Sequence, residues 1–161
     1  MAPGLGSFIS GAILFEETLY QNHADGDTMV AKLKKQGIIP GIKVDTGLKP
    51  LTGALPHETY CCGLDGLTER AIQYYIAGAR FAKWRAVLQI SNDGPSDFAI
   101  TENAWGLARY ARAVQEAGLV PIIEPEILMD GDHTIDRTAA VQEKVIRSVY
   151  DKCFQVGVLL E

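Results

Sequence analysis

Three apolar segments of this sequence close with two charged residues that stand one position apart. The pairs are Lys43 with Asp45, Lys83 with Arg85, and Glu124 with Glu126. Side chains at positions i and i+2 of a strand point to the same face, so each pair is predicted to lie together on one face of a sheet. The pairs recur at almost equal spacing along the chain, which indicates an active site assembled at one end of a sheet.

The chemistry of these residues suits an anionic substrate that is rich in oxygen atoms. Arginine and lysine both bind phosphate, the first through a planar fork and the second as a point charge, so Arg85 and Lys43 are candidate phosphate ligands. A carboxylate beside a second carboxylate and a lysine can be adjusted for general acid–base catalysis, which makes Glu124 or Glu126 a candidate for that role. Because the charges of the three pairs sum to zero, a purely structural network of ion pairs is the alternative interpretation.

The composition limits the class of protein. A length of 161 residues predicts one domain, and a hydrophobic content of 47% is enough for a sizeable core. The net charge of −5, without a basic run, argues against a nucleic-acid or an anionic-membrane partner. Three cysteines, two of them adjacent, do not predict a disulfide framework, and no signal peptide is visible, so we expect a reducing, cytoplasmic location. The scattered histidines and cysteines have no metal-ligand spacing, and no metal or cofactor is expected.

Strand and helix patterns alternate along the chain. Apolar runs predict buried strands at residues 9–15, 38–44, 81–87, 119–124 and 156–161. Amphipathic patterns predict helices between them, at residues 28–36, 65–78, 96–117 and from 134 or 136 to about 154. The expected N-caps are Asp65 for the second of these helices, Ser96 for the third, and Thr134 or Asp136 for the last.

Such alternation predicts an α/β fold with a parallel sheet, in either a doubly wound or a barrel arrangement. No glycine-rich nucleotide-binding motif follows a strand, and charged residues close three separate strands, which favours the barrel. Five strands cannot close a barrel of eight. We therefore predict an incomplete (β/α)8 TIM barrel over residues 9–161, preceded by a separate N-terminal segment at residues 1–8.

Longer motifs around the charged pairs resemble class I fructose-bisphosphate aldolase. The motifs occupy residues 13–21, 41–45, 63–67, 81–85, 106–111, 120–128 and 130–133. They stand in the order and spacing of that family, and the resemblance extends over nearly the whole chain. It implies the second to sixth strands of a (β/α)8 barrel, a usually homotetrameric assembly, and the reversible cleavage of fructose 1,6-bisphosphate into dihydroxyacetone phosphate and glyceraldehyde 3-phosphate, without a metal.

The resemblance also implies roles for individual residues. Glu124 matches the family's general acid/base glutamate, and Glu126 matches the carboxylate that is hydrogen-bonded beside it. Lys83 matches the lysine that contacts substrate near the scissile bond, while Arg85 and Lys43 match residues of the positive, phosphate-attracting rim. Asp45 lies within the motif, and no role is assigned to it.

One residue of the family's mechanism has no match in this chain. The family acts through a Schiff base on a lysine that follows a Leu-Glu-Gly-x-Leu-Leu-Lys run, and this sequence ends at Leu160 and Glu161 of that run. A polypeptide of these residues alone is therefore predicted to be inactive. The alternatives are a non-catalytic, truncated aldolase-derived protein that acts by association through its open strand edges, or a different (β/α) enzyme of phosphosugars.

Overall fold

The computed structural model describes residues 2–160, and its centre is an open, parallel, four-stranded sheet. The strands lie in the order β1 (Gly11–Leu14), β2 (Ile39–Lys43), β5 (Phe81–Leu88) and β6 (Val120–Ile127). All three neighbouring pairs are parallel, as the alternation of strands and helices predicts. β1 lies at an edge of the sheet, and its Ile13 stays 46% exposed although the sequence predicted a buried strand.

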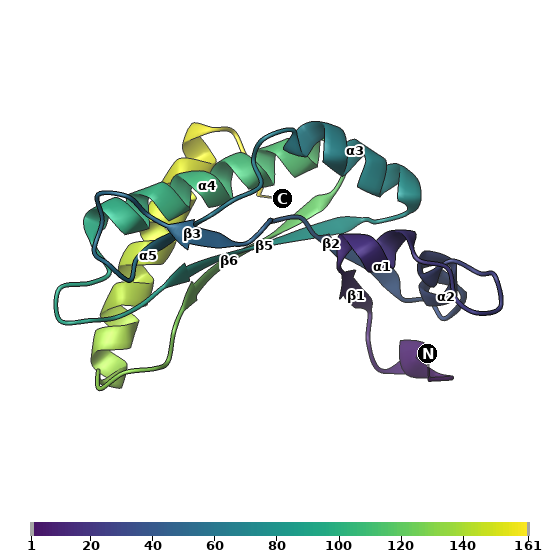
Figure 1. The fold of residues 1–161 in the computed structure, drawn as a ribbon, viewed down its shortest axis with the longest axis horizontal. Coiled ribbons are helices and arrows are strands. Elements are labelled where there is room, and N and C mark those ends of the chain that lie inside the picture. Colours follow the sequence, from purple (N-terminus) through teal and green to yellow (C-terminus); the bar gives the residue numbers. More distant parts are fainter. Residues whose placement is uncertain (1, 161) are drawn as a thin grey trace.

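Helices cover one side of this sheet (Figure 1). They are α1 (Glu16–Tyr20), α2 (Met29–Lys35), α3 (Leu67–Ala77), α4 (Asp97–Glu116) and α5 (Ile135–Gln155), and a 3-10 turn, η1 (Leu5–Ser7), precedes them. Helix α4 packs on β5 and β6, with α3 and α5 beside it. The alternate residues Ala82, Trp84 and Ala86 of β5 are buried under this layer, so the residues between them face the other, inner side of the sheet.

The fifth predicted strand, at residues 156–161, is wrong for the part that the structure describes. Gly157 has φ +70°, and Val158 N donates to Cys153 O over 2.9 Å, so the segment begins as a helix C-cap. Beyond it, Leu159 exchanges two hydrogen bonds with the Gln115 side chain instead of pairing with a strand. Glu161 lies outside the described residues.

Side-chain caps account for the starts of the two long helices. Ser96 Oγ accepts a hydrogen bond from Ala99 N, and Thr134 Oγ1 accepts one from Arg137 N, so Ser96 is confirmed and Thr134 is the correct choice of the two alternatives. The predicted cap Asp65 is wrong. Gly66, at φ 62°, takes the capping position of α3 without a side-chain hydrogen bond, because a glycine enters this left-handed conformation without strain.

The long connection before α3 contains a hairpin that the sequence pattern did not reveal. β3 (Leu48–Pro50) and β4 (Thr59–Cys61) pair in the antiparallel direction, and β4 packs against β5 and α4. Cys62, directly after β4, holds the chain that leaves β2: its carbonyl accepts from Thr46 N and its N–H donates to Gly47 O, both over 2.9 Å.

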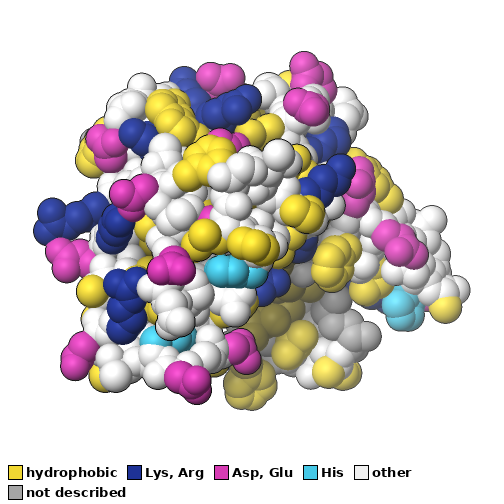
Figure 2. Space-filling view, turned by 60° about the vertical axis from the view of Figure 1, so that its left-hand side comes forward, with side chains coloured by type: hydrophobic (Ala, Val, Ile, Leu, Met, Phe, Trp, Pro, Cys, Tyr) yellow, Lys and Arg dark blue, Asp and Glu magenta, His cyan; other side chains and the backbone are white. Residues whose placement is uncertain are grey.

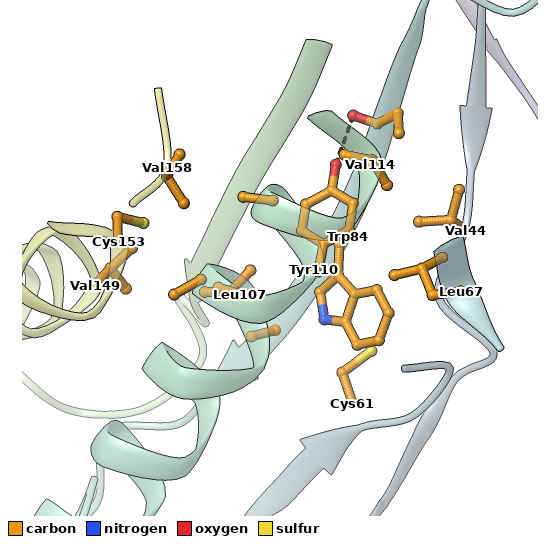
Figure 3. Packing of buried hydrophobic residues seen from close by; sticks show 14 of the residues in the cluster. Val44, Cys61, Leu67, Trp84, Leu107, Tyr110, Val114, Val149, Cys153 and Val158 are labelled. Carbon is orange, nitrogen blue, oxygen red and sulfur yellow. Dashed lines mark hydrogen bonds between the residues drawn. The ribbon is translucent and has the colours of Figure 1, made fainter. Parts of the chain in front are cut away.

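An aromatic pair forms the centre of the core between α4 and the sheet (Figure 3). The rings of Trp84 and Tyr110 stack with centroids 5.3 Å apart, and both side chains are fully buried. The Tyr110 hydroxyl donates to the carbonyl of Ala82 over 2.7 Å and also lies 3.2 Å from that of Ile122, so it touches both β5 and β6. A buried phenol needs such a partner, and here it ties the helix layer to the two strands that carry most of the charged residues.

A glycine in β2 makes room for an aromatic ring on the inner side of the sheet. A Cβ placed on Gly41 would lie 2.2 Å from ring carbons of Phe81, the residue opposite it in β5. The Pro-Gly sequence at residues 40–41 weakens a strand pattern, but here the missing side chain is what allows the ring to lie across the strand.

The outer surface shows no gathering of one charge sign on the face drawn in Figure 2, where basic and acidic side chains lie interspersed. None of the helices within residues 2–160 is both long and apolar enough to cross a membrane.

Candidate active site

The charged residues identified in the sequence lie on the inner side of the sheet. Lys43 is the last residue of β2, whereas Lys83 and Arg85 lie within β5, and Glu124 and Glu126 lie within β6. Strands β5 and β6 are thus longer than predicted, and their charges do not end them. In the parallel register Lys43 stands opposite Lys83, and Arg85 stands opposite Glu124, so all five residues come from three adjacent strands.

Each cation of the site has a carboxylate partner. Lys83 Nζ lies 2.7 Å from Glu124 Oε2. Arg85 Nε donates to Glu126 Oε2, and Lys43 Nζ donates to Asp45 Oδ1. The first two pairs cross between strands, and each cation reaches the carboxylate two positions beyond its own register partner.

The electrostatic environment keeps Arg85 cationic. The hydrogen bond that Arg85 donates to Glu126 raises the pKa of Arg85, and the charges of Glu126, Glu124 and Asp45 act in the same direction, whereas partial burial opposes them. Three carboxylates therefore act on one guanidinium. Because that guanidinium and its partner Glu126 are both partly exposed, an incoming phosphate could reach the guanidinium's free N–H groups.

Lys83 and Glu124 form the more enclosed pair of the two cross-strand pairs. The Lys83 side chain is only 16% exposed, compared with 40% for Arg85. Glu124 also lines a cavity of about 520 Å³ between β6 and α5, together with Ile122, Tyr150 and other largely apolar residues. A carboxylate with a lysine on one side and an apolar cavity on the other has the surroundings of a proton-transfer group.

Tyr110 supports this site from the core, and Asp45 belongs to it, but sequence reasoning assigned neither residue a role. The Tyr110 hydroxyl contacts the backbone carbonyls of the residues just before Lys83 and two before Glu124. An aromatic residue at a helical position signals packing, but not a contact with a particular strand. Asp45 was noticed by type and spacing, but the sequence pattern did not reveal that it is buried beside Cys61 of the hairpin.

The histidines and cysteines do not join the site. His23, His57 and His133 lie outside it, and no group of three or more potential metal ligands occurs within the described part of the chain. The cysteines Cys61, Cys62 and Cys153 are free thiols.

Comparisons with known proteins identify relatives of the whole chain. The family model "Fructose-bisphosphate aldolase class-I" matches residues 1–161. The chain is 59% identical over 160 residues to fructose-bisphosphate aldolase 2, chloroplastic, from Arabidopsis thaliana, covering 99% of this chain and 40% of the relative. It is 61% identical over 148 residues to fructose-bisphosphate aldolase 2, chloroplastic, from Pisum sativum, covering 92% of this chain and 42% of the relative.

A solved structure agrees with these relatives in fold. Fructose-bisphosphate aldolase from Plasmodium falciparum, determined in complex with TRAP and a small-molecule inhibitor, superposes with a TM-score of 0.95 at 54% sequence identity. The superposition covers 98% of this chain and 46% of that protein, so the chain spans less than half the length of the relatives that it matches.

The relatives correct one expectation. A cytoplasmic location was expected, but the similar aldolases from Arabidopsis thaliana, Oryza sativa and Spinacia oleracea are all chloroplastic proteins. The expectation was wrong because free cysteines indicate a reducing compartment without saying which one.

Proposed function

Because the chain belongs to the class I fructose-bisphosphate aldolase family, we propose that it supplies the proton-transfer and phosphate-binding part of an aldolase active site. The proposed reaction is the reversible aldol cleavage of fructose 1,6-bisphosphate into dihydroxyacetone phosphate and glyceraldehyde 3-phosphate. The observation that carries the proposal is the set of three ion pairs on one inner face of β2, β5 and β6. Buried or half-buried charges at this density are costly unless a polar ligand uses them.

Glu124 is the proposed general acid/base, and Lys83 is the proposed catalytic partner. Their 2.7 Å contact holds the carboxylate in one orientation on the inner side of the sheet, where it can exchange a proton with a substrate hydroxyl. The Lys83 ammonium stabilises the ionised carboxylate and can donate to a substrate oxygen as negative charge develops there.

Lys43 and Arg85 are the proposed phosphate ligands, and Glu126 is the residue that orients Arg85. The Glu126 carboxylate occupies the Nε edge of the guanidinium. The remaining N–H groups can then approach a phosphate in the bidentate manner that arginine favours. No metal is needed for these roles.

The Schiff-base lysine of the family has no match among the 161 residues. Lys83 is not proposed as a substitute, because its ammonium is bound to Glu124 and the nucleophile of an aldol cleavage must be a free amine at the substrate carbonyl. The activity is therefore proposed for a complete polypeptide that includes that lysine, and a polypeptide of these residues alone is predicted to be inactive. We also propose a plastid location, because the similar relatives are chloroplastic, and a homotetrameric assembly, because the family is usually tetrameric.

The test uses the complete product of the gene and the 161-residue polypeptide in parallel. Glu124→Gln in the complete product should lower kcat by about 10²- to 10⁴-fold, the range for loss of a positioned acid/base group. Glu143→Gln, on the exposed face of α5 and paired with Arg147, is the matched control and should leave kcat unchanged. Full activity of the Glu124 variant would exclude the proposed role.

The covalent step is tested by borohydride reduction in the presence of dihydroxyacetone phosphate. The complete product should form a stable adduct, and the 161-residue polypeptide should form none. A substrate-dependent adduct on the shorter polypeptide would show that one of its own lysines is the nucleophile.

A further inference from the structure

Asp45 has the most buried side chain of the charged residues at the site. Its side chain is 3% exposed, whereas that of its partner Lys43 is 25% exposed. Oδ1 accepts a hydrogen bond from Lys43 Nζ, but Oδ2 is buried and has no hydrogen-bond partner within residues 2–160. A buried carboxylate with an unpaired oxygen opposes folding, and proteins keep such groups mainly where function needs them.

The backbone around Asp45 is fixed on both sides. Val44 N donates to Lys83 O over 3.1 Å, which continues the β2–β5 ladder, and Thr46 N donates to Cys62 O over 2.9 Å. The Arg70 guanidinium donates to the carbonyls of both Val44 and Gly63, and so joins the two chain segments. The backbone that carries the Asp45 carboxylate is therefore held by β5, by the chain after β4 and by α3, independently of Lys43.

A close approach of the two segments reinforces this arrangement. A Cβ placed on Gly63 would lie 3.1 Å from Thr46 N and 3.4 Å from Asp45 Cα. Only a glycine at that position lets the chain after β4 approach the chain after β2 so closely without movement.

The surroundings of Asp45 explain which side chain depends on it. Burial, with the added negative charge of Asp45, raises the pKa of the Cys61 thiol to about 12, so the neighbouring sulfur stays protonated and uncharged. The Asp45 charge also acts on Arg85, but that guanidinium already has Glu126 as its direct partner. Lys43 has no other carboxylate within ion-pair distance in the described chain, so Asp45 is the hydrogen-bond acceptor that restrains its ammonium, while the centroid of the Phe15 ring lies 5.8 Å from the same Nζ.

We propose that Asp45 is a positioning residue that fixes the Lys43 ammonium on the inner face of the sheet, where it can bind a substrate phosphate. The proposal rests on the proposed phosphate-binding role of Lys43. A lysine side chain is long and flexible, and a rigid carboxylate at the next residue of the same face removes most of its freedom before the substrate arrives. Asp45 itself does not touch the substrate.

The kinetic test is a double-mutant cycle in the complete gene product. Asp45→Asn should raise KM for fructose 1,6-bisphosphate about tenfold and change kcat less than about twofold, because phosphate binding is weakened while the proton-transfer pair is intact. In a Lys43→Met background, the same substitution should raise KM less than about twofold further, because the residue through which Asp45 acts is gone. Equal effects of Asp45→Asn in both backgrounds, or an effect on kcat alone, would overturn the proposal.

A second measurement does not depend on aldolase activity. The complete gene product is treated with a limited amount of acetic anhydride, and the acetylation of each lysine is measured by mass spectrometry. Asp45→Asn should increase labelling of Lys43 about fivefold or more, because a buried acceptor that holds its ammonium is lost. The control is Asp97→Asn, which removes the partner of Lys144 in an exposed pair and should change labelling of Lys144 by less than about twofold.

The outcomes separate the inference from the proposed function. A complete gene product without aldolase activity would refute the proposed function, and the labelling comparison would still decide whether Asp45 restrains Lys43. Unchanged labelling of Lys43 in folded Asp45→Asn would overturn the inference even if the enzyme is active. If Asp45→Asn does not fold, Lys43→Met replaces it: it should lower the unfolding midpoint by several degrees more than Lys144→Met, because it leaves Asp45 buried without its cation. Equal midpoints would overturn the inference.

Discussion

Glu58 offers the sharpest test of how the hairpin is attached to the rest of the fold. This residue, just before β4, is 5% exposed. Its carboxylate accepts hydrogen bonds from Leu55 N over 3.0 Å, from Ser96 N over 2.6 Å and from Ser96 Oγ over 2.7 Å. It therefore joins the hairpin to the residue that caps α4, and the capping hydroxyl is itself oriented by Glu58.

The substitution Glu58→Gln replaces one carboxylate oxygen by an NH₂ group and removes the charge. All three partners are donors, so at least one of them would face another donor in the variant. A hydrogen bond to a charged group is worth about 1.5–3 kcal/mol, so the free energy of unfolding should fall by about 2–3 kcal/mol. Glu143→Gln, which breaks an exposed pair within α5, should cost no more than about 0.5 kcal/mol.

The assay is urea unfolding of the wild type and both variants at several pH values. Burial raises the pKa of Glu58, but the hydrogen bonds from Ser96 and Leu55 together outweigh this effect. The pKa of Glu58 in the folded state is therefore lower than its usual value. A carboxyl whose pKa is lower in the folded state stabilises the protein fully above its unfolded value, about 4.3, and loses that contribution as the pH falls through the folded value. The difference between wild type and Glu58→Gln should thus be largest at pH 7 and shrink below about pH 4. A difference that is absent at pH 7, or the same at pH 7 and pH 3, would refute this reasoning.

Three further predictions concern single residues of the core and the inner face. Gly41→Ala should lower the free energy of unfolding by about 1–2 kcal/mol, because the new Cβ would overlap the Phe81 ring, and the loss should disappear in a Phe81→Ala background if that overlap is the cause. Tyr110→Phe should lower the free energy of unfolding in urea by about 1 kcal/mol, because it removes the buried hydroxyl and leaves the ring stacking intact. An unchanged midpoint would mean that the hydroxyl does not contribute to stability through the two strand carbonyls. Iodoacetamide should alkylate the half-buried Cys62 long before Cys61, whose burial and raised pKa keep it a thiol, and peptide mapping that finds Cys61 modified first would contradict the structure.

The parts of the fold that follow from local sequence were predictable. Ser96 and Thr134 are small hydroxyl residues directly before long amphipathic segments, and both cap helices as expected. The parallel order of the sheet follows from strand and helix alternation. The incorrect or missing predictions concern elements that depend on contacts between distant residues or that are too short to show a pattern. Gln115, far away in the sequence, bonds the backbone of Leu159 and replaces strand pairing, and the hairpin before α3 has strands of only three residues each, too short for an alternating pattern.

The placement of the charged residues on one face was predictable, but the pairing among them was not. Period-two spacing correctly placed Lys83 with Arg85, and Glu124 with Glu126, on the same face of neighbouring strands. Which cation meets which carboxylate depends on the register of β5 against β6, and no feature of the sequence fixes that register. The deep burial of Asp45, whose carboxylate lies beside Cys61 of the hairpin, was equally hidden.

The sequence left open whether the charged residues form a structural network of ion pairs or a substrate site, and the observed pairing is compatible with both. A structural network and a substrate site differ in what happens to the ion pairs when a phosphate arrives, and both begin with every cation satisfied. The pairs here are graded in exposure, from Asp45 at 3% to Arg85 at 40%. A ligand would therefore meet the Arg85 pair first, where solvent already weakens the attraction between the partners and the remaining N–H groups of the guanidinium can be reached. The Lys83–Glu124 pair is more enclosed, and the attraction between its partners is correspondingly less screened, which suits the proton-transfer role proposed for it. Added salt should accordingly weaken binding of fructose 1,6-bisphosphate to the complete gene product, with the larger part of that salt dependence lost in Arg85→Met. A salt dependence that is unchanged in this variant would place the phosphate contact elsewhere.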